Sequence, residues 1–394
     1  MAFCIQGFSL RTKRCQQRRG NVIVLATFLM VFLLGLLAFA CDLGYLLMAR
    51  TQLQRAADSA AMASAWTLLD ERRLIGGNYL EELQSAARDT AVQYVSLNKV
   101  AGANPQLDLN SDNRLEGDVV IGRFVEGGKI STAGDAERYN AVRVRVQRSN
   151  DRNGEIGLFF ARIFGSDSSR MTADAIATYR DGISGFRANN NTGNVSLLPF
   201  ALDIKTWRGL LRGEGFDDWA YDKDSKAVFR GPDGLRETRL FPMNKNRRSG
   251  ITPGNFGTVD IGAQDNSSAT LMRQIREGVS QQDLEYHGGQ LALDPLSKTL
   301  FLDGDTGVDG NLELALDDIL GQPRTIPLYS KVSGSGDTAT YTIVAFAGIR
   351  ILDFNLHTND SYVLIQPALV VDDGAISDGG SSSYAVFQPV ILSH

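Results

Sequence analysis

Residues 22–41 form an unbroken stretch of apolar and small side chains, VIVLATFLMVFLLGLLAFAC, that carries no charge. As a helix, which rises about 1.5 Å per residue, this stretch is roughly 30 Å long and matches the hydrocarbon core of a bilayer. The sequence therefore predicts a single transmembrane helix near the N-terminus, and the remainder of the chain has to fold outside the lipid.

The charges on either side of the stretch predict its orientation. Residues 1–20 carry no acidic side chain, whereas Asp42 opens the opposite flank. Because basic flanks stay in the cytoplasm, we expect residues 1–20 to be a cytoplasmic tail of a single-pass inner-membrane protein whose C-terminal region is extracytoplasmic. The five basic residues of the tail are Arg11, Lys13, Arg14, Arg18 and Arg19.

Two forms of processing remain open for this segment. Residues 38–40, Ala-Phe-Ala, fit the small residues of a signal-peptide cleavage site, although the apolar stretch is longer than the core of most signal peptides. Cys41 stands where a lipoprotein cysteine would, but Ala38 occupies a position that larger aliphatic residues take in lipoprotein signals. We expect the helix to be retained as an anchor.

The helical pattern continues beyond the apolar stretch to residue 73. Arg50, Gln54 and Asp58 recur at every fourth position and form a polar row, while a second face carries small alanine side chains. Such a face allows another helix to approach closely, and the approaching element is either part of the same domain or a helix of a partner. The predicted helix-interaction residues are Asp42, Gln54, Ala57, Asp58, Ala61 and Ala65.

These features resemble the N-terminal signature of the tight-adherence (Tad) proteins of the TadE/TadG type. The resemblance rests on Gly20 before the apolar stretch, on Asp-Leu-Gly at 42–44, and on the run LQ-x-AAD-x-AA-x-A at 53–63. It implies a non-catalytic, membrane-anchored component of Flp pilus assembly, in an apparatus through which bacteria adhere to surfaces. The implied partners are other Tad or pilus-assembly envelope proteins, or further copies of the chain, and no cofactor is expected.

Two features of related proteins are not expected in this chain, because its sequence departs from their patterns. Gly20 is followed by an apolar stretch that lacks the glutamate of peptidase-processed pilins, so cleavage after Gly20 is not expected. Residues 167–169, Asp-Ser-Ser, lack the spacing of the von Willebrand A metal motif that some TadG-type proteins carry, so no such metal site is predicted.

The net charge and the positions of the cysteines indicate which partners and which cross-links the exported part can have. The chain has a net charge of −5, and residues 42–394 hold 35 basic against 45 acidic side chains, a net charge of −10. An acidic surface argues against nucleic acid as a partner. All three cysteines, Cys4, Cys15 and Cys41, precede Asp42, so the exported part is held together without disulfides.

Periodicity and turn residues predict an α+β fold with largely antiparallel sheets. The transmembrane and stalk helix is expected at 21–75, a first extracytoplasmic region at 76–185, an asparagine-rich linker at 186–196, and a second, strand-rich region at 197–394. Further helices are expected at 78–102, 155–164, 267–279 and 311–320. Strands are expected at 118–124, 141–147, 171–179, 324–329, 338–347, 362–371 and 384–392, together with a hairpin of 227–229 and 235–241 around the turn at 231–234.

The sequence shows no motif for catalysis. His287 and His357 each follow an aspartate by four residues, which falls short of a zinc ligand set, and the GxGxxA string at 334–339 lies between two expected strands rather than before a helix. No metal site is predicted, although Asp303, Asp305 and Asp309 in a glycine-rich loop leave calcium open. A membrane-anchored hydrolase or ligand-binding domain is the alternative function.

Overall fold

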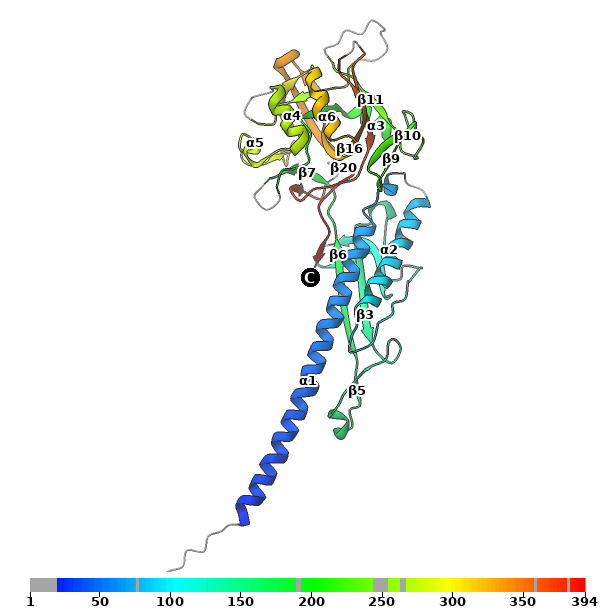
Figure 1. The fold of residues 1–394 in the computed structure, drawn as a ribbon, viewed down its shortest axis with the longest axis vertical. Coiled ribbons are helices and arrows are strands. Elements are labelled where there is room, and N and C mark those ends of the chain that lie inside the picture. Colours follow the sequence, from blue (N-terminus) through cyan, green and yellow to red (C-terminus); the bar gives the residue numbers. More distant parts are fainter. Residues whose placement is uncertain are drawn as a thin grey trace, which may run out of the picture.

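The structure is a computed structural model, and it describes residues 20–75, 78–125, 127–188, 193–243, 254–262, 267–357, 360–380 and 383–393. Figure 1 shows two folded bodies stacked end to end and one long helix, α1 (Gly20–Thr67), which extends far beyond them. The expected continuous helix is confirmed for the apolar stretch and the alanine-rich stretch, which are two halves of α1, but the helix ends at Thr67 instead of residue 73. The basic tail, with Cys4 and Cys15, lies outside the described residues.

The first body consists of two helices on one five-stranded antiparallel sheet. The C-terminal half of α1 and helix α2 (Asn78–Leu97) pack together, and α1 also packs against strands β3 and β6 of the sheet. The strand order is β2-β1-β3-β6-β22. The strands are β1 (Val119–Val125), β2 (Lys129–Ser131), β3 (Ala141–Arg148), β6 (Met171–Thr178) and β22 (Ile391–Ser393).

The alternating pattern of the two central strands places small and β-branched side chains toward the helices. Val142, Val144 and Val146 of β3 are fully buried, as expected from their spacing. Their neighbours on β6 are alanines, among them Ala177, which lies opposite Val142. Because these side chains are short, α1 lies close to the sheet and forms one hydrophobic core with it.

A narrow extension of the first body runs alongside α1. Two short strands, β4 (Ile156–Gly157) and β5 (Ser168–Ser169), pair with each other and carry the 3₁₀ turn η3 (Ala161–Phe164) at their tip. The helix predicted for 155–164 is therefore wrong for its first half, because Ile156 pairs in a strand. The turn ends as expected at Gly165, whose φ of 87° lies in the left-handed region that favours glycine.

The second body is built around an eight-stranded mixed sheet. The strands β16, β14, β12, β8 and β15 pair in this order, and β15 pairs with β16 as well, so the five strands form a closed ladder. The pair of β15 and β8 is the parallel one in this ladder. Strands β17 and β11 extend the sheet beyond β16. The long strand β16 pairs with four strands: its first residues lie between β14 and β15, and β20 and β17 pair with residues farther along it. The strands are β8 (Phe200–Asp203), β11 (Thr238–Leu240), β12 (Phe256–Val259), β14 (Leu300–Asp305), β15 (Pro323–Ser333), β16 (Ala339–Asn355), β17 (Tyr362–Pro367) and β20 (Ser383–Tyr384).

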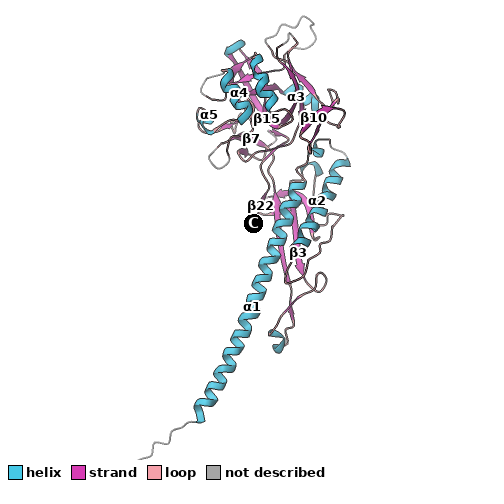
Figure 2. Cartoon of the chain, viewed as in Figure 1, coloured by secondary structure: helices cyan, strands magenta, loops and turns pink. Residues whose placement is uncertain are grey.

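Helices and a small second sheet cover this ladder (Figure 2). Helix α4 begins after Ser267, whose hydroxyl accepts from Thr270 N, as its predicted role as a cap requires. The fold class is confirmed: α+β with mostly antiparallel pairing. The remaining helices and turns are α3 (Ile204–Leu211), α4 (Ser268–Glu277), α5 (Gln281–Glu285), α6 (Glu313–Asp318), η1 (Glu71–Leu74), η2 (Ala136–Arg138), η4 (Gly310–Leu312) and η5 (Gly336–Thr338).

The hairpin predicted around residues 231–234 is wrong. The strand before the turn, β10, pairs with the preceding strand β9, while the strand after it, β11, pairs with β17, more than 100 residues later in the chain. The other short strands are β7 (Ile183–Phe186), β9 (Trp219–Asp222), β10 (Ala227–Arg230), β13 (Leu291–Ala292), β18 (Val370–Val371), β19 (Ala375–Ser377) and β21 (Val386–Phe387).

The chain passes between the two bodies more than once. Phe186, the first residue of the predicted linker, belongs to β7 and is buried between β13 and β19 of the second body. At the other end of the chain, β22 returns to the first body and pairs with β6. The division into 76–185 and 197–394 stays a prediction, and both contacts constrain where a boundary can be drawn.

Candidate functional site

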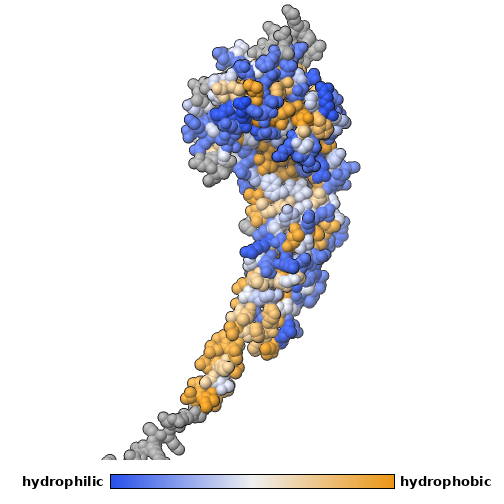
Figure 3. All heavy atoms as spheres, viewed as in Figure 1, coloured by the Kyte–Doolittle hydropathy of each residue, from blue (hydrophilic) through white to orange (hydrophobic). Residues whose placement is uncertain are grey.

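The N-terminal half of α1 is an exposed apolar rod. Every large apolar side chain from Val22 to Phe39 leaves half or more of its surface uncovered, and Figure 3 shows this half as hydrophobic over most of its visible face. In the part of the chain that the structure describes, α1 is the one helix long and apolar enough to cross a membrane. The rod therefore has the form of a single-pass anchor.

The C-terminal half of α1 carries the predicted alanine face, and the chain itself covers that face. Ala57, Ala61 and Ala65 have no exposed surface and belong to the core formed by α1, α2 and the first sheet. The two helices approach so closely that Ser64 Oγ donates a hydrogen bond to the carbonyl oxygen of Ala87 on α2, at 2.6 Å. Whether a helix of another protein also reaches this face stays a prediction, but these alanines present no surface to it in this conformation.

Two predicted polar residues of α1 form a small network beside this core. Gln54 Nε2 lies 2.8 Å from Asp58 Oδ1 and 3.1 Å from the carbonyl oxygen of Asp174 on β6, and donates to both. The i, i+4 spacing that suggested the pair thus brings Gln54 and Asp58 together. The network ties the helix to the sheet within the first body.

Asp42, the first charged residue after the apolar stretch, makes a separate contact. Its side chain is only 4% exposed, and its carboxylate accepts three backbone N–H bonds, from Phe159 at 2.9 Å, Phe160 at 3.0 Å and Ala161 at 2.7 Å. The carboxylate thereby satisfies the free N–H groups at the start of η3, a role that a capping residue usually has. Asp42 lies 12 residues before Gln54, about 18 Å along the helix, so the predicted residues form two contacts rather than one.

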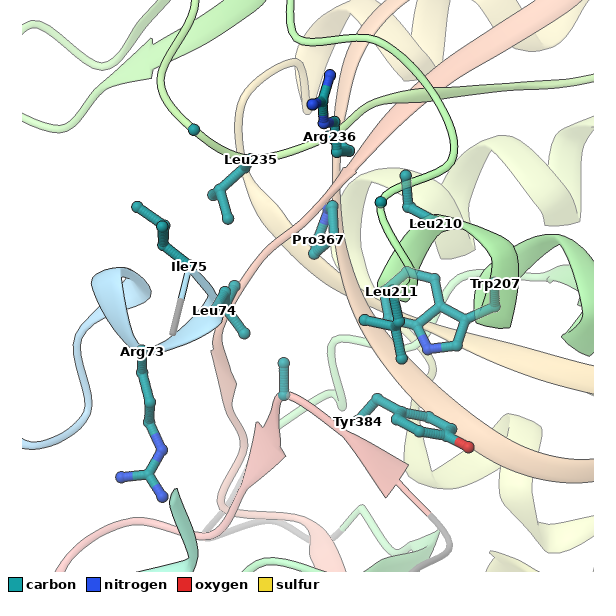
Figure 4. Close-up of a pocket in the computed structure, with 13 residues that line it drawn as sticks. Arg73, Leu74, Ile75, Trp207, Leu210, Leu211, Leu235, Arg236, Pro367 and Tyr384 are labelled. Atoms are coloured by element: carbon teal, nitrogen blue, oxygen red, sulfur yellow. The ribbon is translucent and has the colours of Figure 1, made fainter. Parts of the chain in front are cut away.

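A cavity of about 430 Å³ lies where the two bodies meet. Figure 4 shows its walls coming from η1, from α3 and from the segments that carry Leu235 and Tyr384. Two guanidinium groups border it, but Arg73 reaches out of it to Tyr179 of the first body, at 2.6 Å from Nη1 to Oη. The surface that lines the cavity is about equally polar and apolar, and its residues include no carboxylate. The lining residues are Arg73, Leu74, Ile75, Trp207, Leu210, Leu211, Gly213, Gly234, Leu235, Arg236, Pro367, Tyr384 and Ala385.

The three aspartates that left calcium binding as a possibility accept hydrogen bonds from other groups of the chain. Asp303 accepts from Thr340 Oγ1 at 2.9 Å, Asp305 from Gly307 N at 2.8 Å, and Asp309 from Asn311 N at 3.0 Å. These are bonds within a strand pair, a turn and a cap. Over the described ranges, no three His, Cys, Asp or Glu side chains are grouped so that they could hold a metal ion.

The two histidines have different neighbours from those that the spacing suggested. Asp283 binds Arg273 and Ser280, and Asp353 accepts from Tyr362 Oη at 2.7 Å. His357 Nε2 lies 3.3 Å from Glu313 Oε2. Burial lowers the pKa of His287 below its ordinary value, which favours the neutral imidazole. The GxGxxA string lies between β15 and β16, with only the short turn η5 inside it.

Two features were missed by sequence reasoning. The first is the set of exposed apolar side chains at the tip that carries η3; the signal was the run LFFARIF at 158–164, whose hydrophobic residues follow no one-sided period. The second is an ion pair between Glu71 of η1 and Arg350 of β16, which joins the two bodies. No local pattern links residues that are 279 positions apart.

Comparison with known families covers α1 and the first body. Residues 20–67, which coincide with α1, match the family Tad, described as Flp pilus-assembly TadE/G-like. Residues 63–177 match the family Tad_C, described as Tad-like Flp pilus-assembly. No curated protein and no solved structure matches the chain. The predicted resemblance is confirmed over residues 20–177, which match Tad-like Flp pilus-assembly families.

Proposed function

We propose that the chain is a non-catalytic assembly component of a Tad/Flp-type pilus or a related adhesion apparatus of the cell envelope. One observation supports the proposal above the others: the family match at 20–67 coincides with α1, a helix whose N-terminal half is exposed and apolar and whose C-terminal half is buried in the core of the first body. Such a helix ties the folded region rigidly to a membrane anchor.

The proposed location is the inner membrane, with the N-terminus in the cytoplasm and both bodies outside. The five basic residues before the apolar stretch support this orientation, since basic flanks stay in the cytoplasm. The net charge of −10 on residues 42–394 agrees with an exported region that does not bind nucleic acid.

The proposed partners are other pilus-assembly proteins of the envelope or further copies of the chain. Because Ala57, Ala61 and Ala65 are already covered, the surface that α1 offers to other helices is its apolar N-terminal half. Helix association inside a bilayer depends on close packing of such surfaces. We therefore place the contact with partner helices between Val22 and Phe39 rather than on the alanine face.

The proposal is tested in the bacterium that encodes the chain. Its gene is deleted, then replaced by a tagged full-length copy or by a copy whose residues 20–41 are exchanged for an unrelated transmembrane helix of equal length. We expect the deletion to abolish Flp pili, and affinity capture of the full-length protein from detergent extracts to recover pilus-assembly proteins. The exchanged copy, which still anchors the folded region, is expected to recover fewer of them.

Two results would contradict the proposal. Normal piliation in the deletion strain would exclude a role in assembly, and capture of the full-length protein without any pilus-assembly protein would exclude the partners. Equal capture by the exchanged copy would move the contact from the apolar half of α1 to the folded bodies.

A further inference from the structure

The tip that carries η3 exposes apolar side chains at an unusual density. Four of the six residues from 159 to 164 are large and apolar, and they are exposed by 62% (Phe159), 41% (Phe160), 76% (Ile163) and 80% (Phe164). Single exposed apolar residues are common on protein surfaces, but a cluster of this kind marks an interaction site.

Asp42 holds the start of this tip beside the point on α1 where the apolar half ends. Its carboxylate holds the backbone of Phe159, Phe160 and Ala161, and it is the residue directly after the uncharged stretch 22–41. The ring of Phe159 also meets Tyr45 of α1 edge to face, with centroids 5.1 Å apart. The start of the tip is therefore held at the end of the proposed membrane span.

The rest of the tip extends from Asp42 along α1 toward its apolar N-terminal half. In Figure 1 the segment around β5 is the part of the two bodies that reaches farthest along α1 toward its N-terminal half. Figure 3 shows that the hydrophobic surface of α1 continues onto this end of the first body. The apolar side chains of the tip and those of the span thus form one continuous apolar surface.

The polar groups of the tip suit the boundary between lipid and water. Arg162 is exposed between the apolar residues, and its long side chain can reach lipid phosphates while its aliphatic stem stays among them. Farther from the tip, Arg170 is paired with Glu155 at 2.6 Å, and Asp167 is exposed. Aromatic residues beside a basic residue are typical of segments that lie in the membrane interface.

We propose that this tip, the side chains of Phe159, Phe160, Ile163 and Phe164, inserts into the extracytoplasmic leaflet of the membrane that α1 spans. The bilayer is the expected occupant because the tip surface is continuous with the apolar surface of the anchor and lies at its end. A second contact with lipid restrains the rotation and tilt of the folded region about a single helix. The inference rests on the proposed anchoring by α1.

The test measures the depth of spin labels in full-length protein, at one copy per nanodisc of phosphatidylethanolamine and phosphatidylglycerol. The native cysteines Cys4, Cys15 and Cys41 are replaced by serine, and a single cysteine is introduced by Ile163→Cys. The control label is placed by Leu296→Cys, since Leu296 is 94% exposed in the second body, and Met30→Cys reports the anchor. Oxygen collects in lipid and a water-soluble nickel chelate does not, so the ratio of their collision rates reports depth.

We expect the label at 163 to collide preferentially with oxygen, as the label at 30 does, and the label at 296 to collide preferentially with the nickel chelate. A label at 163 that behaves like the one at 296, while the label at 30 is in lipid, would overturn the tip insertion and leave the anchor intact. A label at 30 that is in water would instead contradict the anchor. Shielding at 163 that arises only with several copies per nanodisc would show that protein covers the tip, and would also overturn the inference.

A charge variant supplies an independent readout. With the label introduced by Ser166→Cys, the changes Ile163→Asp and Phe164→Asp are expected to shift that label from the interface into water, because ionised carboxylates are costly to bury in lipid. The matched change Leu296→Asp is expected to leave the label at 166 where it was. No shift with the aspartate pair would contradict insertion of these two side chains.

Discussion

Glu71 and Arg350 form an ion pair at the junction of the two bodies, with 2.5 Å between Glu71 Oε1 and Arg350 Nη2. Arg350 is only 2% exposed, donates from Nε to the carbonyl oxygen of Gly321 at 2.7 Å, and lies over the ring of Tyr221 at 3.9 Å from its centroid. Since Glu71 belongs to η1, directly after α1, this pair transmits the position of the membrane helix to the second body.

Replacing Glu71 by alanine is expected to destabilise the second body. The change leaves the buried guanidinium of Arg350 without its charged partner, and loss of one member of a buried pair costs about 3–5 kcal/mol. Urea unfolding of the detergent-solubilised full chain, followed by tryptophan fluorescence, measures the effect. The exposed Glu285→Ala is the control, with an expected change within about 0.5 kcal/mol.

A double-mutant cycle separates the pair from its surroundings. If the two residues interact as described, Glu71→Leu with Arg350→Leu together destabilise less than the two single changes added, because neither charge is then left alone. Strict additivity would show that the pair makes no contribution to the junction.

The alanine face of α1 is expected to tolerate no larger side chain at Ala61. This residue has no exposed surface, so a leucine there has to displace α2 or the sheet, at a cost of about 1–3 kcal/mol. Ala63→Leu is the matched control, because Ala63 lies on the same helix and is only half-buried. Equal urea midpoints for the two variants would contradict the burial of the alanine face.

Local patterns predicted the elements better than they predicted the partners of those elements. The spacing of Val142, Val144 and Val146 predicted β3 correctly, because alternation is a property of the strand itself. The segment after the turn at 231–234 also forms a strand, but β11 pairs with β17 instead of the nearby β10. The choice depends on the tertiary fold, which brings β17 beside β11 and which no short window of sequence contains.

The same limit applies to the candidate site. The charge-free stretch and the alanine run predicted the membrane anchor and the close helix contact, since both are properties of one helix. What the alanine run packs against could not be predicted, because α2 and the sheet are defined only by tertiary structure. For Asp42, the sequence indicated a role, but its three backbone donors lie 117–119 residues away.

Tyr179 is expected to stabilise the first body in a pH-dependent manner. Its hydroxyl donates to the carbonyl oxygen of Tyr139 at 2.7 Å and accepts from Arg73 at 2.6 Å, and Tyr179→Phe should cost about 1–3 kcal/mol at pH 7. Burial raises the pKa of Tyr179 to about 12, although Arg73 opposes the shift.

The sign of the pH effect follows from this raised pKa. Below about pH 10 the hydroxyl is protonated in the folded and unfolded states, and its stabilisation is complete. As the pH rises toward 12, the hydroxyl of Tyr179 ionises in the unfolded state before it does so in the folded state. The wild type therefore loses stability, whereas Tyr179→Phe has no hydroxyl at this position to ionise. The difference between their unfolding free energies should shrink over this range, whereas exposed Tyr286→Phe should show no such trend.

Asp42→Ala is expected to release the tip from α1 while leaving the core of the first body folded. The three N–H groups of Phe159, Phe160 and Ala161 lose their acceptor, so their amides should exchange with solvent faster. Hydrogen exchange with mass spectrometry on the full chain in nanodiscs checks this, and β3 provides the internal reference. Asp89→Ala on the exposed side of α2 is the control and should leave the 158–165 peptides unchanged. Unaltered exchange at 159–161 in Asp42→Ala would mean that another group holds the tip at the membrane end of α1.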